Sequence, residues 1–70
     1  MANRLVYKGS LSFYKKNFDI EITPALINPE YCVKVRAFYD GKGFCSKKYN
    51  PPIRVAFGLE EIKYMIKDRL

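Results

Sequence analysis

Hydrophobic and polar residues alternate along two segments near the N-terminus, residues 11–13 and 18–22. A period of two is typical of β-strands that bury one face and expose the other. The polar residues between the segments indicate a turn, which we centre on residues 16–17. This turn predicts an antiparallel hairpin with one apolar face, on which Phe13 lies opposite Ile20.

Two further extended segments follow a loop that contains two prolines. Residues 31–39 alternate as a third strand, and the sequence Asp-Gly-Lys-Gly at 40–43 favours a turn into a fourth strand at 44–49. The two prolines within residues 50–52 cannot donate to a hydrogen-bonded ladder. We therefore expect the chain to bend there, before another extended segment at 53–57.

The hydrophobic period changes after Gly58. From there the apolar residues recur at helical spacing, and the stripe they form is Leu59, Ile62, Ile66 and Leu70. Glu60 and Glu61 suit the first turn of a helix, because a helix N-terminus carries partial positive charge. The stripe packs on the sheet or forms the interface of a homodimer, which the small size of the chain favours.

The order of these segments predicts an α+β fold, a four- to five-stranded antiparallel sheet followed by one C-terminal helix. A fifth strand would come from residues 5–8, which either lead the sheet or extend its first strand. Residues 1–70 are too few for more than one domain.

The hairpin of the third and fourth strands is predicted to have two different faces. With a turn at Gly41 and Lys42, Arg36 lies opposite Lys47 and Lys34 lies opposite Tyr49. The inner face then consists of Val33, Val35, Ala37, Tyr39 and Phe44, with Ser46 and Lys48 toward its end. The outer face consists of Lys34, Arg36, Phe38, Lys47 and Tyr49.

Positive charge is concentrated on this hairpin. The chain has a formal charge of +6, and residues 34–54 hold six Lys and Arg against one acid, Asp40. Cations track a phosphate backbone, and exposed rings stack on the bases of single strands. The predicted nucleic-acid-binding residues are Lys34, Arg36, Phe38, Lys42, Lys47, Lys48, Tyr49 and Arg54.

A solvated hairpin face also carries Lys and Arg for solubility alone. Like charges directly opposite one another cost stability, however, so the predicted pair of Arg36 and Lys47 favours a functional surface.

Other chemistry is sparse in this sequence. It contains no His, no paired acids in a plausible cleft and no Ser with a candidate base, so we predict no catalytic residues, no metal site and no cofactor. Cys32 and Cys45 are expected to be reduced structural thiols. With no signal-peptide pattern at the start and no 18-residue apolar stretch, a cytoplasmic location is expected, or a nuclear one in a eukaryotic host.

Four short segments, VKVRAFYDGKGF, CSKKYNPPIR, VAFG and LEEIKYMI, follow one another within residues 33–66. Their order resembles the positive cofactor four family of single-stranded-DNA-binding transcriptional coactivators. The resemblance implies a four-stranded antiparallel sheet, a homodimer formed through the C-terminal helix, and binding of single-stranded DNA. It assigns backbone contacts to Lys34, Arg36, Lys47, Lys48 and Arg54, and stacking to Phe38 and Tyr49. The family's Pro-Gly-Lys-Lys-Gly kink is replaced here by Asn-Pro-Pro-Ile-Arg, and the chain has no Trp.

The hypothesis that follows is a non-enzymatic protein that binds single-stranded nucleic acid, preferably DNA, in transcription, replication or recombination. Two alternatives stay open. The segment order is also similar to the small sheet domains of integrases and plant-type transcription factors, which lie in the major groove of duplex DNA. A third class is an interaction or inhibitor protein whose basic patch binds an acidic partner, with Phe38 and Tyr49 as anchors.

Overall fold

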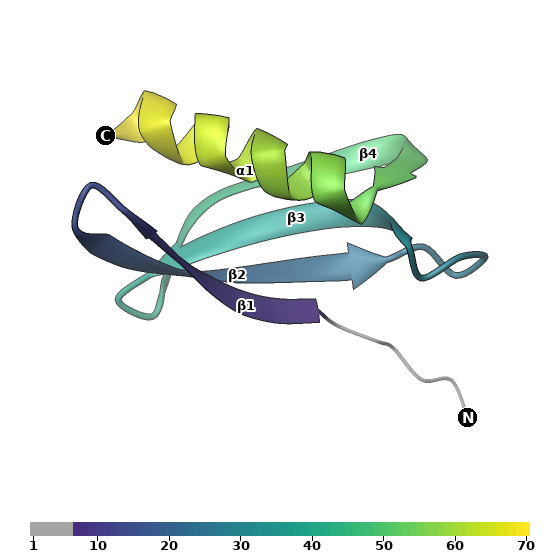
Figure 1. Cartoon of the computed structure of the whole chain (residues 1–70), viewed down its shortest axis with the longest axis horizontal. Helices are drawn as coiled ribbons and strands as arrows, with labels where there is room; N and C mark the ends of the chain where they lie inside the picture. Colours follow the sequence, from purple (N-terminus) through teal and green to yellow (C-terminus); the bar gives the residue numbers. More distant parts are fainter. Residues whose placement is uncertain (1–6) are drawn as a thin grey trace.

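In the computed structural model, residues 7–70 form one antiparallel sheet followed by one helix (Figure 1). The elements are β1 (Tyr7–Phe13), β2 (Lys16–Pro24), β3 (Tyr31–Tyr39), β4 (Lys42–Arg54) and α1 (Val55–Arg69), and the strand order is β1-β2-β3-β4. The α+β prediction is confirmed, with four strands. Residues 1–6 lie outside the described residues, and with them the first half of the suggested strand at 5–8 and most of the segment searched for a signal peptide. Tyr7 and Lys8 belong to β1 and so extend the first strand.

The first two strands form the predicted hairpin, but the turn between them lies earlier than expected. It consists of Tyr14 and Lys15, with φ values of 53° and 63°. Positive φ at both central residues is the geometry of a type I′ turn, which usually carries Asn or Gly, so the pair Tyr14-Lys15 does not predict it. Phe13 faces Lys16 instead of Ile20. The pairing moves by an even number of residues, and the apolar face of the hairpin is therefore as predicted.

The turn between β3 and β4 is also earlier than predicted. It consists of Asp40 and Gly41, with φ values of 55° and 78°, and Phe38 consequently faces Gly43. Asp-Gly is a favoured pair in two-residue hairpin turns, because both positions tolerate positive φ. This change alone would leave the predicted faces of β4 intact, since it too shifts the pairing by an even number.

A β-bulge at Phe44 reverses the faces of the strand that follows. Phe44 is an extra residue in β4, and beyond it Ala37 faces Cys45. The bulge turns both Phe44 and Cys45 toward the helix side of the sheet, where the Phe44 ring lies 5.1 Å from that of Phe18. Residues 46–49 therefore each lie on the face opposite to the predicted one.

A second irregularity interrupts β3 at Val33. Cys32 pairs with Ile53, whereas Lys34 pairs with Lys48, so the single residue Val33 lies opposite four residues of β4, an excess of three. The fourth strand thus continues through the prolines instead of ending at residue 49. Cys32 occupies the core and Val33 is only half-buried, so the prediction that Val33 belongs to the inner face was wrong.

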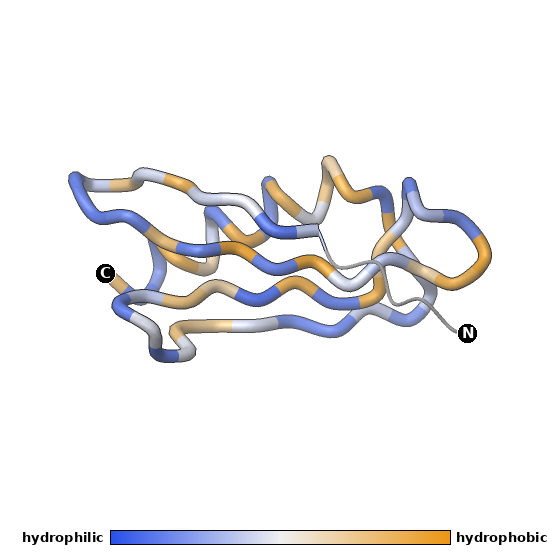
Figure 2. The backbone as a smooth tube through the Cα atoms, turned by 90° about the horizontal axis from the view of Figure 1, so that it is seen from below, coloured by the Kyte–Doolittle hydropathy of each residue, from blue (hydrophilic) through white to orange (hydrophobic). Residues whose placement is uncertain are grey.

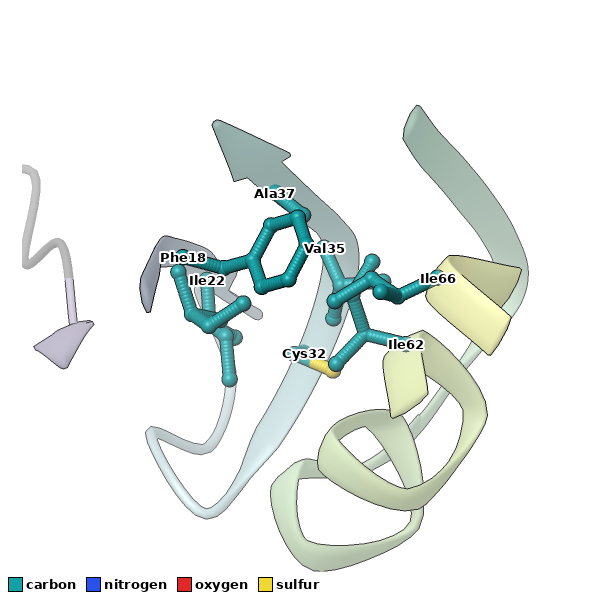
Figure 3. Packing of buried hydrophobic residues seen from close by; sticks show 8 residues of the cluster. Phe18, Ile22, Cys32, Val35, Ala37, Ile62 and Ile66 are labelled. Atoms are coloured by element: carbon teal, nitrogen blue, oxygen red, sulfur yellow. The ribbon is translucent and has the colours of Figure 1, made fainter. Parts of the chain in front are cut away.

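The core lies between the sheet and the helix (Figure 3). Its apolar residues come from β2, β3 and α1, so it is made by segments that are distant in the sequence. They are Phe18, Ile20, Ile22, Cys32, Val35, Ala37, Ile62 and Ile66. The predicted inward orientation of Val35 and Ala37 is confirmed.

The helix begins at Val55, so the extended segment expected at 53–57 is divided between β4 and α1. Its first turn contains no acidic residue, and Glu60 and Glu61 lie further along than predicted. Gly58 is buried within the helix instead of preceding it. A Cβ there would lie 3.1 Å from both Cys32 Sγ and Val35 Cγ1, so a side chain fits only if these two residues move by a few tenths of an ångström.

The helix packs along β3 and β4 and leaves the opposite face of the sheet open (Figure 1). Hydrophobic and polar residues alternate along the strands, as Figure 2 shows, because one face of the sheet packs on the core and the other meets solvent. Within residues 7–70, no helix is long and apolar enough to cross a membrane.

Candidate nucleic-acid interface

Cations and rings gather on the open face of β3 and β4, in a set that differs from the predicted one. On this face Tyr31 pairs with Arg54, Lys34 with Lys48, and Phe38 with Gly43, while Arg36 lies between the last two pairs. We call this surface the basic-aromatic strip; its residues are Tyr31, Lys34, Arg36, Phe38, Lys48 and Arg54. The strip runs along β3 from Tyr31 to Phe38, which is about 23 Å at a rise of roughly 3.3 Å per residue.

Each ring of the strip lies close to a guanidinium group. Arg54 Cζ is 5.8 Å from the centroid of the Tyr31 ring, and Arg36 Cζ is 5.4 Å from that of Phe38. Both rings are half-buried. Guanidinium planes and aromatic rings are both surfaces on which an unpaired base stacks, so the two ends of the strip each offer a charge and a flat face.

Between these ends, Lys34 and Lys48 lie directly opposite one another. Within residues 7–70, neither lysine forms an ion pair with an acid. Like charges opposite one another in a ladder are destabilising. An anion such as a phosphate would relieve this repulsion.

Glu21 of β2 limits the strip on one side. Its carboxylate accepts a hydrogen bond from Arg36 Nη2 at 2.7 Å, and Lys8 Nζ lies 4.0 Å from it. Asp19 of the same strand pairs with Phe38. The β1–β2 half of the open face thus carries two acids against Lys8, whereas the β3–β4 half carries four cations.

The structure places Lys47 and Tyr49 on the helix side of the sheet, so their predicted outward orientation was wrong. Lys47 Nζ lies 3.6 Å from Glu61 Oε1 of the helix and 5.4 Å from the centroid of the Tyr49 ring. The Tyr49 hydroxyl is buried and has no hydrogen-bond partner among the described residues. Burial raises the pKa of Tyr49 above its ordinary value of 10.0, with smaller contributions from Glu61 and Cys32. The bulge at Phe44 is the physical cause of this exchange.

The other predicted binding residues lie on or near the strip. Lys34, Arg36, Phe38, Lys48 and Arg54 all belong to it, although Lys48 was expected on the inner face. Lys42 is exposed at the start of β4, beside the turn.

Tyr31 is the residue that the sequence analysis missed. Simple alternation places it on the same face as Val33 and Val35, which are apolar. The irregularity at Val33 moves Tyr31 to the open face, and no local sequence pattern predicts this irregularity.

The predicted dimer residues of the helix are only partly accessible. Ile62 and Ile66 are completely buried against the chain's own sheet. Leu59 is half-buried against the core, and Leu70 is 49% exposed. The stripe therefore packs mainly against the sheet of its own chain, and little of it is left for contact with a second copy.

Both thiols are free and lie on the helix side of the sheet. Burial raises the pKa of Cys32 and of Cys45 above 9.0, and for Cys45 the charge of Arg69 opposes the effect. Among the described residues, no group of three or more His, Cys, Asp and Glu side chains is arranged to hold a metal ion.

Comparison with models of protein families, with curated proteins and with solved structures found no match for this chain. The chemistry of the basic-aromatic strip is therefore the basis on which a function is proposed.

Proposed function

We propose that this protein binds single-stranded nucleic acid across the basic-aromatic strip. The observation that carries the proposal is the direct opposition of Lys34 and Lys48 between two guanidinium-ring pairs. Such an arrangement destabilises the free protein, and a bound polyanion would relieve the repulsion between the two lysines.

The rings favour a single strand over a duplex. A duplex hides the faces of its bases, whereas a single strand presents them to Tyr31 and Phe38. The open face of the sheet carries four of its cations on the β3–β4 half, whereas on the β1–β2 half Lys8 lies beside two acids. A strand following β3 and β4 would meet the four cations of the strip and avoid Asp19.

The test is a competition titration of oligothymidine against duplex DNA of the same length. We expect the single strand to bind more tightly, with an affinity that falls as salt increases. Lys34, Lys48 and Arg54 form no ion pair among the described residues, whereas Arg36 is paired with Glu21. Three phosphate contacts predict a slope of log K against log salt of roughly −2, because each contact contributes about −0.7 on single strands. Preference for duplex would favour an integrase-like sheet domain, and no binding to either would favour an acidic protein partner.

A matched pair of lysine variants tests whether the strip is the binding surface. Lys48→Ala is expected to reduce the salt slope by about 0.7, because it removes one phosphate contact. Lys47→Ala is the control, since Lys47 is adjacent in sequence but paired with Glu61 on the other side of the sheet. Equal effects of the two substitutions would contradict the assignment of the strip.

A further inference from the structure

The loop between β2 and β3 carries two large apolar side chains that the fold does not bury. Leu26 is 98% exposed and Ile27 is 87% exposed, the highest values among the large hydrophobic residues of the described chain. We call these two residues the apolar tip. The loop projects beyond the end of the sheet (Figure 1), and its hydrophobic stretch is visible at the corresponding end of the molecule in Figure 2.

Hydrogen bonds across the base of the loop and on the C-terminal side of the tip hold the loop in a defined shape. The Ala25 amide donates to the Tyr31 carbonyl at 2.7 Å, and the Tyr31 amide donates to the Asn28 carbonyl at 2.9 Å. The Glu30 amide donates to Asn28 Oδ1 at 3.0 Å. The exposure of the tip therefore belongs to an ordered loop and does not arise from a frayed end.

The loop is anchored on a residue of the basic-aromatic strip. Tyr31 closes the loop through two backbone hydrogen bonds, and its ring lies under the Arg54 guanidinium. The apolar tip thus continues the strip at the end where β3 begins.

We propose that the apolar tip contacts the bases at one end of a single strand bound along the strip, an inference that rests on the proposed function. Leucine and isoleucine are among the side chains that nucleic-acid-binding proteins insert against base faces. Arg54 would hold the phosphate there, and Leu26 and Ile27 would cover the base that follows the one on Tyr31.

The charges around the tip are unfavourable for binding to an anionic lipid surface. Residues 24–31 contain one acid, Glu30, and no Lys or Arg. An apolar loop that binds anionic lipid headgroups is normally surrounded by several cations. Among the described residues near this tip, the charge of Glu30 is balanced by a single cation, Arg54.

Tryptophan fluorescence tests the contact directly, because the chain has no Trp of its own. In Leu26→Trp, oligothymidine is expected to quench the indole emission by stacking. Tyr14→Trp is the control. Tyr14 is 60% exposed and lies in the turn between β1 and β2, at the end of β2 opposite to the apolar tip. Its emission should stay unchanged.

A double variant tests the contribution of the tip to affinity. Leu26→Ser with Ile27→Ser is expected to weaken oligothymidine binding about tenfold, because the two aliphatic side chains no longer bury apolar surface against a base. The salt slope should not change, because no phosphate contact is removed. Tyr14→Ser is the control and should bind like the parent protein. Circular dichroism would check that each variant remains folded.

The outcomes separate this inference from the proposed function. If Lys48→Ala weakens binding while the double variant binds like the parent and Leu26→Trp emission is constant, the tip has no role and the proposed function stands. If the parent binds no oligonucleotide, both fail. If Leu26→Trp responds to vesicles of phosphatidylserine and not to oligothymidine, the tip is a lipid contact and the inference is wrong.

Discussion

Tyr49 combines a buried hydroxyl with a charged neighbourhood. The hydroxyl lacks a hydrogen-bond partner among the described residues, while Lys47 lies over its ring and Glu61 is close enough to affect its pKa. An unsatisfied buried hydroxyl costs about 1–3 kcal/mol, so the benefit of this side chain comes from its ring. Tyr49 therefore contributes to the packing of the core and not to the basic-aromatic strip.

The raised pKa values predict a loss of stability in alkaline solution. The unfolded state releases protons from the thiols near pH 9 and from Tyr49 near pH 10, before the folded state does. The free energy of unfolding should therefore be constant below these values and fall as the pH rises through and above them. Urea unfolding at a series of pH values measures this dependence.

Tyr49→Phe isolates the contribution of the hydroxyl. The variant should match or exceed the parent in stability at pH 7, because it removes an unsatisfied polar group and keeps the ring. Above pH 10 its stability should fall less steeply than that of the parent. An alkaline limb identical to that of the parent would contradict the assigned cause.

At the scale of elements, β4 and α1 are shaped by what they pack against. The bulge at Phe44 puts two consecutive side chains on the core, and the buried Gly58 brings the helix close to β3. Burial of apolar surface and close packing favour both features, although each interrupts a regular local pattern.

Gly58→Ala tests the close approach of the helix. Helix propensity alone favours alanine by about 1 kcal/mol, but its Cβ would meet two completely buried side chains, those of Cys32 and Val35. Overpacking of this kind typically costs 1–3 kcal/mol, so we expect a net loss in the free energy of unfolding of about 1 kcal/mol. Urea unfolding measures it.

The control for this substitution is Ala56→Gly, at an exposed position of the same helix. It should lose about 1 kcal/mol through propensity alone. A gain in stability for Gly58→Ala would mean that the core accommodates the methyl group.

For the whole molecule, the main feature is the difference between the two faces of the sheet. The helix covers one face, and on the open face the β3–β4 half carries four cations, whereas the β1–β2 half carries two acids and Lys8. The strands run along the longest dimension of the molecule, 37 Å (Figure 1). A nucleic-acid strand bound along β3 and β4 would therefore be extended.

The homodimer stays a prediction, and Phe57 and Tyr64 offer the apolar surface for it on the solvent face of the helix. They are 52% and 63% exposed and lie seven residues apart, on one side of the helix. Light scattering is expected to give twice the chain mass of 8.2 kDa. Tyr64→Lys should shift the mass toward one copy, whereas Lys63→Ala should not. A mass of one copy at every concentration would exclude the dimer.

Much of the fold and part of the site could be predicted from short-range pattern. Alternation identified the hairpin of β1 and β2 and the inward positions Val35 and Ala37. The same alternation placed Lys34 and Arg36 on the opposite face of the strand. These predictions succeeded because each depends on a residue and its near neighbours along one regular element.

The sequence by itself determined the element types, the apolar face of the first hairpin and the concentration of charge on the second. Only the tertiary structure decided which side of the sheet Lys47, Lys48, Tyr31 and Tyr49 occupy. A single bulge residue reverses every later side chain of a strand, because the side-chain period is two. That bulge is stabilised by the contact of Phe44 with Phe18, a residue of a different hairpin. No periodicity within β4 contains this information.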